Sequence, residues 1–457
     1  MMRLSEAAVA TKGQVLGGDV QFTCVTTDSR GDNAGQLFVA LHGERVDGHD
    51  FAVSAIGNGA AAAMISHAVD GLPSALLVKD TRRALGDLAG HWRSKFSIPL
   101  AAITGSNGKT TVKEMLAGIL RAAAGSQDLV LATEGNLNND IGLPLTLLKL
   151  RQQHRYAVAE MGMNHFGEIS YLTHIGRPTV ALINNATTAH LGGLGSVDGI
   201  ARAKGEIFEG LAANGTAVIN ADDDFAPLWR SLAGNRAILT FGLSKDADIS
   251  ASFKLHTDSS ELQLRTPLGE AAVDLPVAGQ HNIANALAAA AAAVAMGVTL
   301  PHIVTGLQSF AGVKGRLQQK RGINGALVID DSYNANPASV KAAIDVLVAR
   351  PGEKLLVLGD MGELGGDADE LHAEIGAYAK KAGVNALYVL GELSLEMVKG
   401  FGAGARHFET PAALCQVLEK SMYETSTVLV KGSRFMRMER VVDLITENNS
   451  GGDPHAA

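Results

Sequence analysis

Eight consecutive residues, TGSNGKTT (104–111), combine the glycines and side chains that bind nucleotide phosphates. Gly105 and Gly108 permit a tight turn that brings backbone N–H groups close to an anion. Lys109 supplies a positive charge, and a threonine hydroxyl after it can ligate the magnesium ion of a nucleotide. The predicted nucleotide-binding segment is the loop with the start of the next helix: Gly105, Ser106, Asn107, Gly108, Lys109, Thr110 and Thr111.

The residues on either side of this loop form the context that a phosphate loop requires. The apolar run PLAAI (99–103) predicts a strand before it, and apolar residues at spacings of three and four predict a helix after it. The N–H groups and the positive dipole end of that helix favour a bound anion. Ile103 stands where the general pattern has a glycine, so an ordinary glycine turn with a solvated lysine is the alternative.

Four polar residues farther along the chain are candidates for metal or substrate binding. Glu160 ends the apolar run YAVAE, and a carboxylate at the carboxyl end of a strand beside a phosphate loop is placed to hold magnesium. Asn138 is either a turn former or a substrate contact. His190 lies in a glycine-rich loop, where a lone histidine is usually structural. Lys204 lies beside the apolar stripe of a helical stretch, and composition alone favours a solvated lysine there.

Two further segments allow two interpretations each. Asn282 begins an alanine-rich helical stretch, where it is either the N-cap of the helix or a contact to a base edge. Ser29 and Arg30 belong to a polar segment beside strands near the N-terminus. These two residues, with Arg45, Asp47 and His49 of the same segment, either line a pocket or belong to a solvated loop, and the pattern favours the loop.

Length and alternating elements predict an α/β protein of three domains. The 457 residues exceed one ordinary core. Short apolar runs alternate with helical stretches, which is typical of mostly parallel sheets. We predict domains at 1–97, 98–312 and 313–457, with the glycine-rich, basic AGVKGR (311–316) as a hinge. In the first domain, 51–67 is alanine-rich and predicts a helix.

Composition narrows the classes of partner. The net charge of −8 argues against extensive binding to nucleic acid or to an anionic membrane. The two cysteines form no disulfide framework, and the first residues lack the apolar core of a signal peptide. The longest apolar run, 286–298, is too short to span a bilayer. We expect a cytoplasmic protein without nucleic-acid or membrane partners.

Several motifs taken together resemble the ATP-dependent Mur ligase family. They occur in family order over nearly the whole chain: TGSNGKTT, NLNND, AEMG, TAHL, ARAKGEIF, GQHNIANALAA, VKGR and DDSYNANPAS. The loop LGDMGELG and the N-terminal TTDSR, GQLFVAL and DGHDF are similar to those of the member that adds D-alanyl-D-alanine to UDP-N-acetylmuramoyl-tripeptide. The DNPR sequence of the diaminopimelate-adding relative is absent from this sequence.

The resemblance implies a fold, a reaction and its reactants. The expected domains are an N-terminal α/β UDP-binding domain, a central phosphate-loop (P-loop) mononucleotide-binding parallel sheet and a C-terminal Rossmann-like doubly wound domain. The expected enzyme is a monomeric amide ligase of peptidoglycan precursor synthesis that uses ATP and Mg²⁺. ATP would convert the carboxylate of the UDP-linked tripeptide into an acyl phosphate, which the amine of D-alanyl-D-alanine attacks.

The same resemblance implies catalytic and metal-binding roles. Lys109 would neutralise the terminal phosphates of ATP. Thr110 and Glu160 would hold one magnesium ion, and His190 would help to hold a second. Lys204 matches the family lysine that reacts with carbon dioxide, and the resulting carbamate would be a metal ligand.

Roles in binding the nucleotide and substrate are also implied. Asn282 would approach the adenine, Arg316 at the hinge would reach the phosphates, and Asp331 would contact the ribose. Ser29 and Arg30 would contact the uridine diphosphate. The full set assigned to substrate is Ser29, Arg30, Asn138, Asn334 and Asn336.

Other functions remain as alternatives. Within the family these are the ligase that adds the third residue of the peptide and a folylpolyglutamate synthase. A nucleotide-binding regulator would need the phosphate loop but not Glu160, His190 and Lys204 as a set. An inactive scaffold is disfavoured because every matched motif position is retained.

Overall fold

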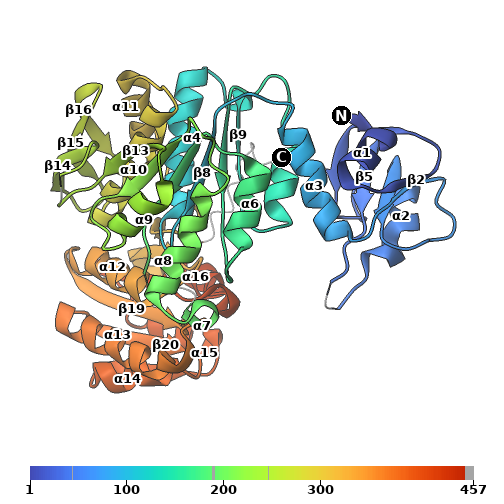
Figure 1. The fold of residues 1–457 in the computed structure, drawn as a ribbon. Helices are drawn as coiled ribbons and strands as arrows, with labels where there is room; N and C mark the ends of the chain where they lie inside the picture. The colour runs from blue at the N-terminus through green and yellow to red at the C-terminus, as the bar shows by residue number, and fades with distance from the viewer. Residues whose placement is uncertain (44, 188–190, 245, 448–457) are drawn as a thin grey trace.

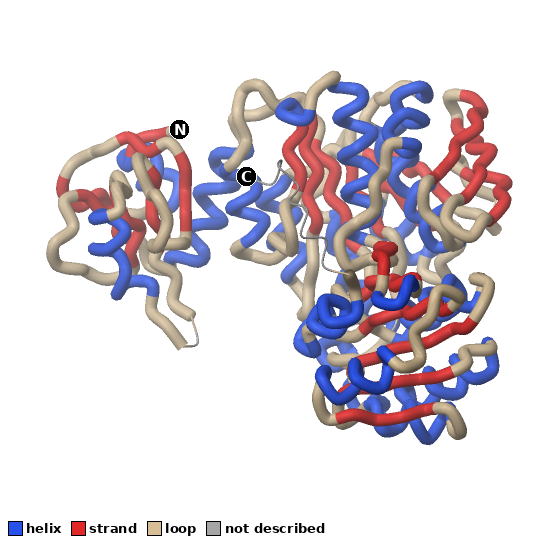
Figure 2. Tube along the Cα trace, turned by 180° about the vertical axis from the view of Figure 1, so that it is seen from behind, coloured by secondary structure: helices blue, strands red, loops and turns tan. Residues whose placement is uncertain are grey.

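Three layered α/β units form the molecule, each around its own sheet (Figure 1). The computed structural model describes residues 1–43, 45–187, 191–244 and 246–447. In this part of the chain no helix is both long and apolar enough to cross a membrane. Seen from behind, the N-terminal unit lies to one side of the central unit, and the C-terminal unit lies beneath the central one (Figure 2).

The N-terminal unit has a five-stranded sheet in the order β2-β7-β6-β5-β4, parallel except for β2. Its strands are β2 (Gln14–Gly17), β4 (Cys24–Thr26), β5 (Gln36–Val39), β6 (Ala62–Ile65) and β7 (Ser74–Leu77). The short β1 (Met2–Arg3) and β3 (Gln21–Phe22) pair separately. Its helices are α1 (Leu4–Thr11), η1 (Gly48–Phe51), α2 (Ala52–Gly57) and α3 (Thr81–Arg93).

The helix predicted over 51–67 is wrong in its second half. The helix α2 ends at Gly57, and the chain turns through Gly59, whose φ is +96°. It then enters β6, where all four residues are buried. Alanine suits a helix and a strand buried on both faces equally well, so the alanine-rich pattern carried no period that distinguishes the two.

The central unit has a six-stranded sheet, all parallel, in the order β13-β12-β11-β8-β10-β9. Its strands are β8 (Leu100–Thr104), β9 (Val130–Ala132), β10 (Tyr156–Glu160), β11 (Val180–Ile183), β12 (Thr216–Asn220) and β13 (Ala237–Phe241). Its helices are α4 (Lys109–Ala124), η2 (Gln127–Leu129), α5 (Gly142–Leu148), α6 (Glu168–Gly176), α7 (Leu191–Leu194), α8 (Val197–Gly205), η3 (Glu206–Phe208), α9 (Ala226–Ala233), α10 (Gln280–Ala295) and α11 (Leu300–Gln308).

Both faces of the central sheet are buried. In β8, Ala102 packs into the core on one face, while Ala101 and Ile103 pack into the core on the other. The small alanines of α10 are fully buried against that second core, which lets the helix approach the sheet closely. An antiparallel three-stranded sheet that the sequence did not predict covers this side: β14 (Ser250–Leu255), β15 (Ser260–Thr266) and β16 (Gly269–Leu275).

The C-terminal unit has a six-stranded sheet in the order β17-β18-β22-β19-β20-β21, parallel except for the edge strand β17. Its strands are β17 (Gln318–Arg321), β18 (Leu327–Asp331), β19 (Glu353–Gly359), β20 (Ala386–Leu390), β21 (Ala405–Phe408) and β22 (Ser426–Lys431). Its helices are η4 (Ile323–Gly325), α12 (Pro337–Val348), η5 (Gly365–Asp367), α13 (Ala368–Ala382), α14 (Ser394–Phe401), α15 (Pro411–Glu419), η6 (Arg434–Met436) and α16 (Glu439–Ile445).

The chain order of this sheet brings two distant strand ends together. β22, the last strand, inserts between β18 and β19, so β18 and β22 are neighbours. Asp331 and Lys431 pair at the carboxyl ends of these two strands. Ligands of open α/β sheets bind at such ends, and this edge of the sheet faces the central unit.

Candidate active site

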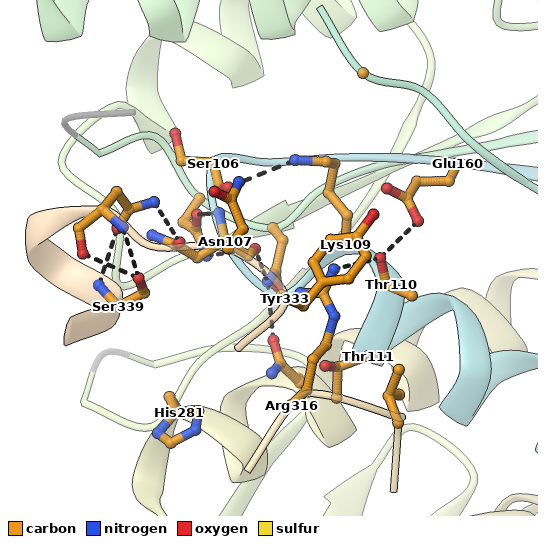
Figure 3. Close-up of a pocket in the computed structure, with 18 of the residues that line it drawn as sticks. Ser106, Asn107, Lys109, Thr110, Thr111, Glu160, His281, Arg316, Tyr333 and Ser339 are labelled. Carbon is orange, nitrogen blue, oxygen red and sulfur yellow. Dashed lines mark hydrogen bonds between the residues drawn. The ribbon is translucent and has the colours of Figure 1, made fainter. Parts of the chain in front are cut away.

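One cavity of about 1240 Å³ lies between the central and C-terminal units. The phosphate loop forms one wall, the hinge segment around 310–316 forms another, and the start of α12 forms a third (Figure 3). A cavity between two units is the usual place for a ligand whose binding closes the units. The predicted hinge and the predicted nucleotide segment therefore meet at one site.

The phosphate loop is held in shape by two asparagines at the end of β11. The Asn107 N–H donates to the Asn185 side-chain oxygen at 2.8 Å, and the Asn184 amide donates to the Asn107 carbonyl at 2.9 Å. Gly108 has a φ of +78°, and a Cβ atom there would lie 2.2 Å from Asn285 Oδ1. Only glycine fits this turn, so the loop is pre-organised for an anion.

Lys109 is the first residue of α4, and its ammonium lies within the loop. Nζ donates to the Gly105 carbonyl at 2.6 Å. Burial lowers the pKa of Lys109, the Glu160 carboxylate acts to raise it, and the Arg316 cation acts to lower it. Lys109 and Arg316 thus concentrate positive charge at the loop, as the terminal phosphates of a nucleotide require.

Thr110 links two other predicted site residues, Glu160 and Arg316 (Figure 3). Its hydroxyl donates to Glu160 Oε2 at 2.9 Å and accepts from Arg316 Nη2 at 2.9 Å. The other carboxylate oxygen of Glu160 accepts from the Asn138 amide at 2.8 Å. Glu160 is buried, and its direct partners Thr110 and Asn138 are both neutral. A buried carboxylate beside a hydroxyl oxygen is a ligand set that suits Mg²⁺, which prefers oxygen ligands.

Lys204 is fully buried on α8, so the alternative of a solvated lysine is wrong. Its amine has no hydrogen-bond or ion-pair partner within the described residues. Burial lowers its pKa well below 10.5, and the nearby Lys109 charge acts in the same direction. A lowered pKa increases the fraction of neutral amine, which is the form that reacts with carbon dioxide. His190, the other predicted ligand of a second metal, lies outside the described residues.

The C-terminal unit adds a contact to the phosphate loop. The side chain of Asn336 donates from Nδ2 to Asn107 Oδ1 at 2.7 Å. Its own Oδ1 accepts from the Ser339 N–H at 2.9 Å, which caps α12. Asn336 therefore bridges the two units while its position is fixed by the helix that it begins.

Three other predicted residues, Arg316, Asp331 and Asn334, line the cavity from this unit. Asp331 accepts from Lys431 Nζ at 2.6 Å, and the same Nζ donates to the Asn334 carbonyl at 2.9 Å. Arg316 lies with its guanidinium carbon 4.4 Å from the centre of the Tyr333 ring. The predicted hinge arginine thus contacts both units, because it also donates to Thr110.

The start of α10 forms the remaining wall. Asn282 lines the cavity, and its amide donates to the Ala278 carbonyl at 2.8 Å from inside the first helical turn. The N-cap interpretation is wrong, because the helix begins at Gln280 and Gly279 precedes it. Next to Asn282, burial lowers the pKa of His281, so this wall is neutral and suits a base better than a phosphate.

Ser29 and Arg30 lie in the N-terminal unit and do not line the cavity. The Ser29 carbonyl accepts from the Asn58 amide at 2.8 Å, and the exposed Arg30 pairs with Asp28 at 2.9 Å. The Asp28 carboxylate raises the pKa of Arg30.

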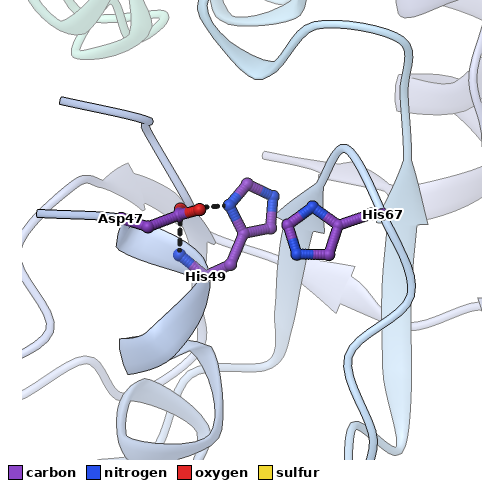
Figure 4. A group of neighbouring side chains, drawn as sticks. All are labelled: Asp47, His49 and His67. Atoms are coloured by element: carbon purple, nitrogen blue, oxygen red, sulfur yellow. Dashed lines mark hydrogen bonds and ion pairs between the residues drawn. The ribbon is translucent and has the colours of Figure 1, made fainter. Parts of the chain in front are cut away.

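A group of two histidines and an aspartate lies farther along the same unit (Figure 4). Asp47 accepts from His49 Nδ1 at 2.6 Å, while His49 Nε2 accepts from the Ser66 N–H at 2.9 Å. The His67 ring stacks on the His49 ring at 4.1 Å. Both ring nitrogens of His49 are engaged, so no lone pair remains for a metal, and the group is a structural network.

Several residues of the site were not identified from the sequence. Asn184 and Asn185 follow an apolar run directly, and Lys431 ends another. Each therefore lies at the carboxyl end of a parallel strand, where the rule that pointed to Glu160 applies equally. Tyr333, which lies beside Arg316, carried no such signal.

Comparison with known proteins finds family matches over most of the chain. Three family models match successive segments: "Mur ligase family, catalytic domain" at 21–93, "Mur ligase middle domain" at 103–293 and "Mur ligase, glutamate ligase domain" at 315–434. The chain belongs to the Mur ligase family. It has the three-domain α/β fold of Mur ligases, with parallel sheets, so the predicted fold class is confirmed.

Individual Mur ligases are similar over nearly their whole length. The UDP-N-acetylmuramoyl-tripeptide--D-alanyl-D-alanine ligase of Escherichia coli is 44% identical, over 98% of this chain and 99% of that protein. The UDP-N-acetylmuramoylalanyl-D-glutamyl-2,6-diaminopimelate--D-alanyl-D-alanyl ligase of Acinetobacter baumannii is 39% identical with a TM-score of 0.87, covering 97% and 98%. The MurF ligase of Thermotoga maritima in complex with ADP is 28% identical with a TM-score of 0.81, covering 92% and 96%.

Proposed function

We propose that this Mur ligase joins D-alanyl-D-alanine to UDP-N-acetylmuramoyl-tripeptide with ATP, in peptidoglycan precursor synthesis. The observation that carries the proposal is the 44% identity over 98% of the chain to a ligase of that name. The structure adds that the phosphate loop, Glu160 and Asn336 converge on one cavity. Amide ligation needs this convergence, because two substrates and a nucleotide must react in one place.

The reaction has two steps that the site can serve. A carboxylate oxygen of the tripeptide attacks the γ-phosphorus of ATP, ADP leaves, and an acyl phosphate forms. The amine of D-alanyl-D-alanine then attacks the acyl carbon, and inorganic phosphate and a proton leave the tetrahedral intermediate. The protein mainly positions the reactants and stabilises negative charge, as in other phosphoryl transfers.

The phosphates of ATP are assigned to the loop of Gly105, Ser106, Asn107, Gly108, Lys109, Thr110 and Thr111. Lys109 neutralises the β- and γ-phosphates, and the N–H groups at the start of α4 bind their oxygens. We assign one magnesium ion to Thr110 and Glu160, and a second to His190 with the carbamate of Lys204. When bound, such ions neutralise the charge that develops on the transferred phosphoryl group.

The remaining walls are assigned to the rest of the nucleotide and to the substrates. Asn282 faces the adenine, Asp331 the ribose and Arg316 the phosphates. The residues assigned to the UDP-linked tripeptide and to the reacting end are Ser29, Arg30, Asn138, Asn334 and Asn336. The neutral wall beside His281 and the Lys431–Asp331 pair support the placement of the nucleoside there.

The domain boundaries and the setting belong to the same proposal. We place the boundaries at 97/98 and 312/313, with the hinge at 311–316. Closure about this hinge would shield the acyl phosphate from water. We also propose that the chain acts as a monomer in the cytoplasm, where ATP and UDP-linked precursors are available.

One experiment tests the proposed function directly. Purified protein receives ATP, Mg²⁺ and UDP-N-acetylmuramoyl-tripeptide, with and without D-alanyl-D-alanine, and phosphate and amide product are both measured. Product formation and phosphate release that both depend on the dipeptide are expected. Phosphate release that is independent of any amine would instead support a nucleotide-binding regulator. Product only with a single amino acid would support a different ligase of the family.

A further inference from the structure

The cations on the cavity wall differ in whether a carboxylate already neutralises them. Three are paired: Arg82 with Asp140, Arg350 with Asp258, and Lys431 with Asp331. Lys109 and Arg316 converge on the phosphate loop. Arg83 is exposed, lines the same cavity and has no ion-pair partner within the described residues. It is therefore a cation available to an anionic ligand at a distance from the nucleotide phosphates.

Arg83 is held in position by an aromatic ring of the central unit. Its guanidinium carbon lies 4.5 Å from the centre of the Tyr171 ring, which belongs to α6. Gly86, one turn along α3, makes room for this ring, because a Cβ atom there would lie 2.0 Å from the Tyr171 hydroxyl oxygen. A guanidinium carries five N–H donors, so Arg83 can match a carboxylate in a bidentate manner while it lies over the ring.

Arg83 lies between the N-terminal unit and the phosphate loop, which are assigned to the two ends of the substrate. Helix α3 follows the N-terminal sheet directly and packs against α5 and α6 of the central unit. The neighbouring Arg82 fixes this packing through two hydrogen bonds to Asp140, at 2.5 and 2.7 Å. Arg83 thus lies where a substrate must pass if its UDP binds the N-terminal unit and its acid end reaches the phosphate loop.

The chemistry of that substrate supplies a matching anion. The Acinetobacter relative is named for a peptide that contains a D-glutamyl residue. A glutamyl residue inside a peptide uses one carboxyl group for its bond to the next residue, and the other stays a free carboxylate. This inference rests on the proposed function. We propose that Arg83 binds the free carboxylate of the glutamyl residue in the UDP-linked tripeptide and so distinguishes it from an amidated form.

The test compares two substrates on four proteins. The substrates are the UDP-linked tripeptide and the same compound with its glutamyl carboxylate converted to an amide. The proteins are the natural chain, Arg83→Gln, Arg83→Lys and the control Arg230→Gln, which changes an exposed arginine on α9 away from the cavity. The readout is kcat/KM and KM for each substrate, with KM for ATP and a melting temperature measured alongside.

The natural chain and Arg230→Gln should prefer the carboxylate form by about 10- to 100-fold, the range of a charge-assisted hydrogen bond. Arg83→Gln should lose this preference through a higher KM for the carboxylate form alone, with KM for ATP unchanged. Arg83→Lys should restore part of it. A preference that persists in Arg83→Gln would overturn the proposal, as would an equal loss for both substrates, which would point to the diphosphate. Absence of amide product from the natural chain would instead overturn the proposed function.

Discussion

The side-chain amide of Asn336 donates to the side-chain oxygen of Asn107 at 2.7 Å, across the cavity between the central and C-terminal units. Asn107 shapes the phosphate loop through its backbone, and Asn336 begins helix α12. The contact therefore connects the nucleotide loop of one unit to the frame of the other. A movement of the C-terminal unit relative to the central one would therefore change a contact to the phosphate loop.

Replacing Asn336 by aspartate separates this contact from the helix cap. Asn336→Asp keeps an oxygen that accepts from the Ser339 N–H, but it turns the donor toward Asn107 into an acceptor. We expect KM for ATP to rise about 10-fold, because one hydrogen bond is lost and the new carboxylate oxygen repels the side-chain oxygen of Asn107. The melting temperature should change little. Asn336→Ala should also lose about 1 kcal/mol of stability through the missing cap. Equal KM values in the natural chain and Asn336→Asp would contradict the role of the contact.

Glu160→Gln tests the metal assignment. The change keeps the size of the side chain but removes a buried negative charge that accepts from Thr110 and Asn138. We expect kcat to fall by at least about 100-fold and the Mg²⁺ concentration for half-maximal rate to rise. The measurement is a magnesium titration at saturating ATP, with the exposed Glu134→Gln as control. An unchanged titration curve would show that Glu160 holds no magnesium.

Lys109→Ala tests the charge at the phosphate loop. The substitution removes a half-buried side chain whose ammonium bonds only loop carbonyls, so the core keeps its packing. We expect turnover to fall by at least about 100-fold while the melting temperature stays close to that of the natural chain. Steady-state kinetics and thermal unfolding of the same preparation check both parts. A near-normal rate would contradict the phosphate assignment.

Lys204→Met tests the buried amine through its pH dependence. Burial lowers the pKa of Lys204 well below 10.5, so between the lowered value and 10.5 the unfolded chain binds a proton that the folded chain lacks. The stability of the natural chain relative to Lys204→Met should therefore rise with pH across this window. Melting temperatures of both proteins at about pH 7 and about pH 10 check the sign. A stability difference that does not change with pH would contradict the prediction, because it would show that Lys204 has the same protonation state in the folded and the unfolded chain.

The same position tests the carbamate assignment by rescue. Lys204→Ala should lose activity, because the proposed carbamate ligand of the second metal is gone. Added short carboxylic acids should restore part of the rate by filling the vacated volume with a carboxylate. Full activity of Lys204→Ala without any added acid would rule the carbamate out.

Asp258→Ala tests a second contact between the same two units. Arg350 at the end of α12 is 6% exposed and pairs with Asp258, which lies between β14 and β15 and also accepts from Gln319 at 2.7 Å. Because the change leaves the nearly buried Arg350 cation without its carboxylate partner, we expect about 1 to 3 kcal/mol of stability to be lost. The units should separate more often, which small-angle scattering would report as a larger radius. The exposed Asp274→Ala in the same small sheet is the control and should leave the radius unchanged.

The sequence alone determined those parts of the site that depend on neighbouring residues. The phosphate loop was predicted because strand, glycine turn and helix follow one another within 99–124. Glu160 was predicted because carboxyl ends of parallel strands meet at one edge, and β10 indeed pairs with β8. Each prediction rests on a periodic pattern in a short stretch of sequence and on a general rule for parallel sheets. Neither needed knowledge of how distant parts of the chain pack.

Only the tertiary structure decided the contacts between residues far apart in the chain. Asn336 and Asn107 are 229 positions apart, and Arg316 and Thr110 are 206 apart. Their pairing depends on how two separately packed units face each other, which no periodicity records. The burial of Lys204 was hidden because a helix pattern shows which face is apolar, but not which charged residue the packing around the helix will bury. The stacking of Arg83 on Tyr171 likewise exists only because Gly86 lets two helices approach.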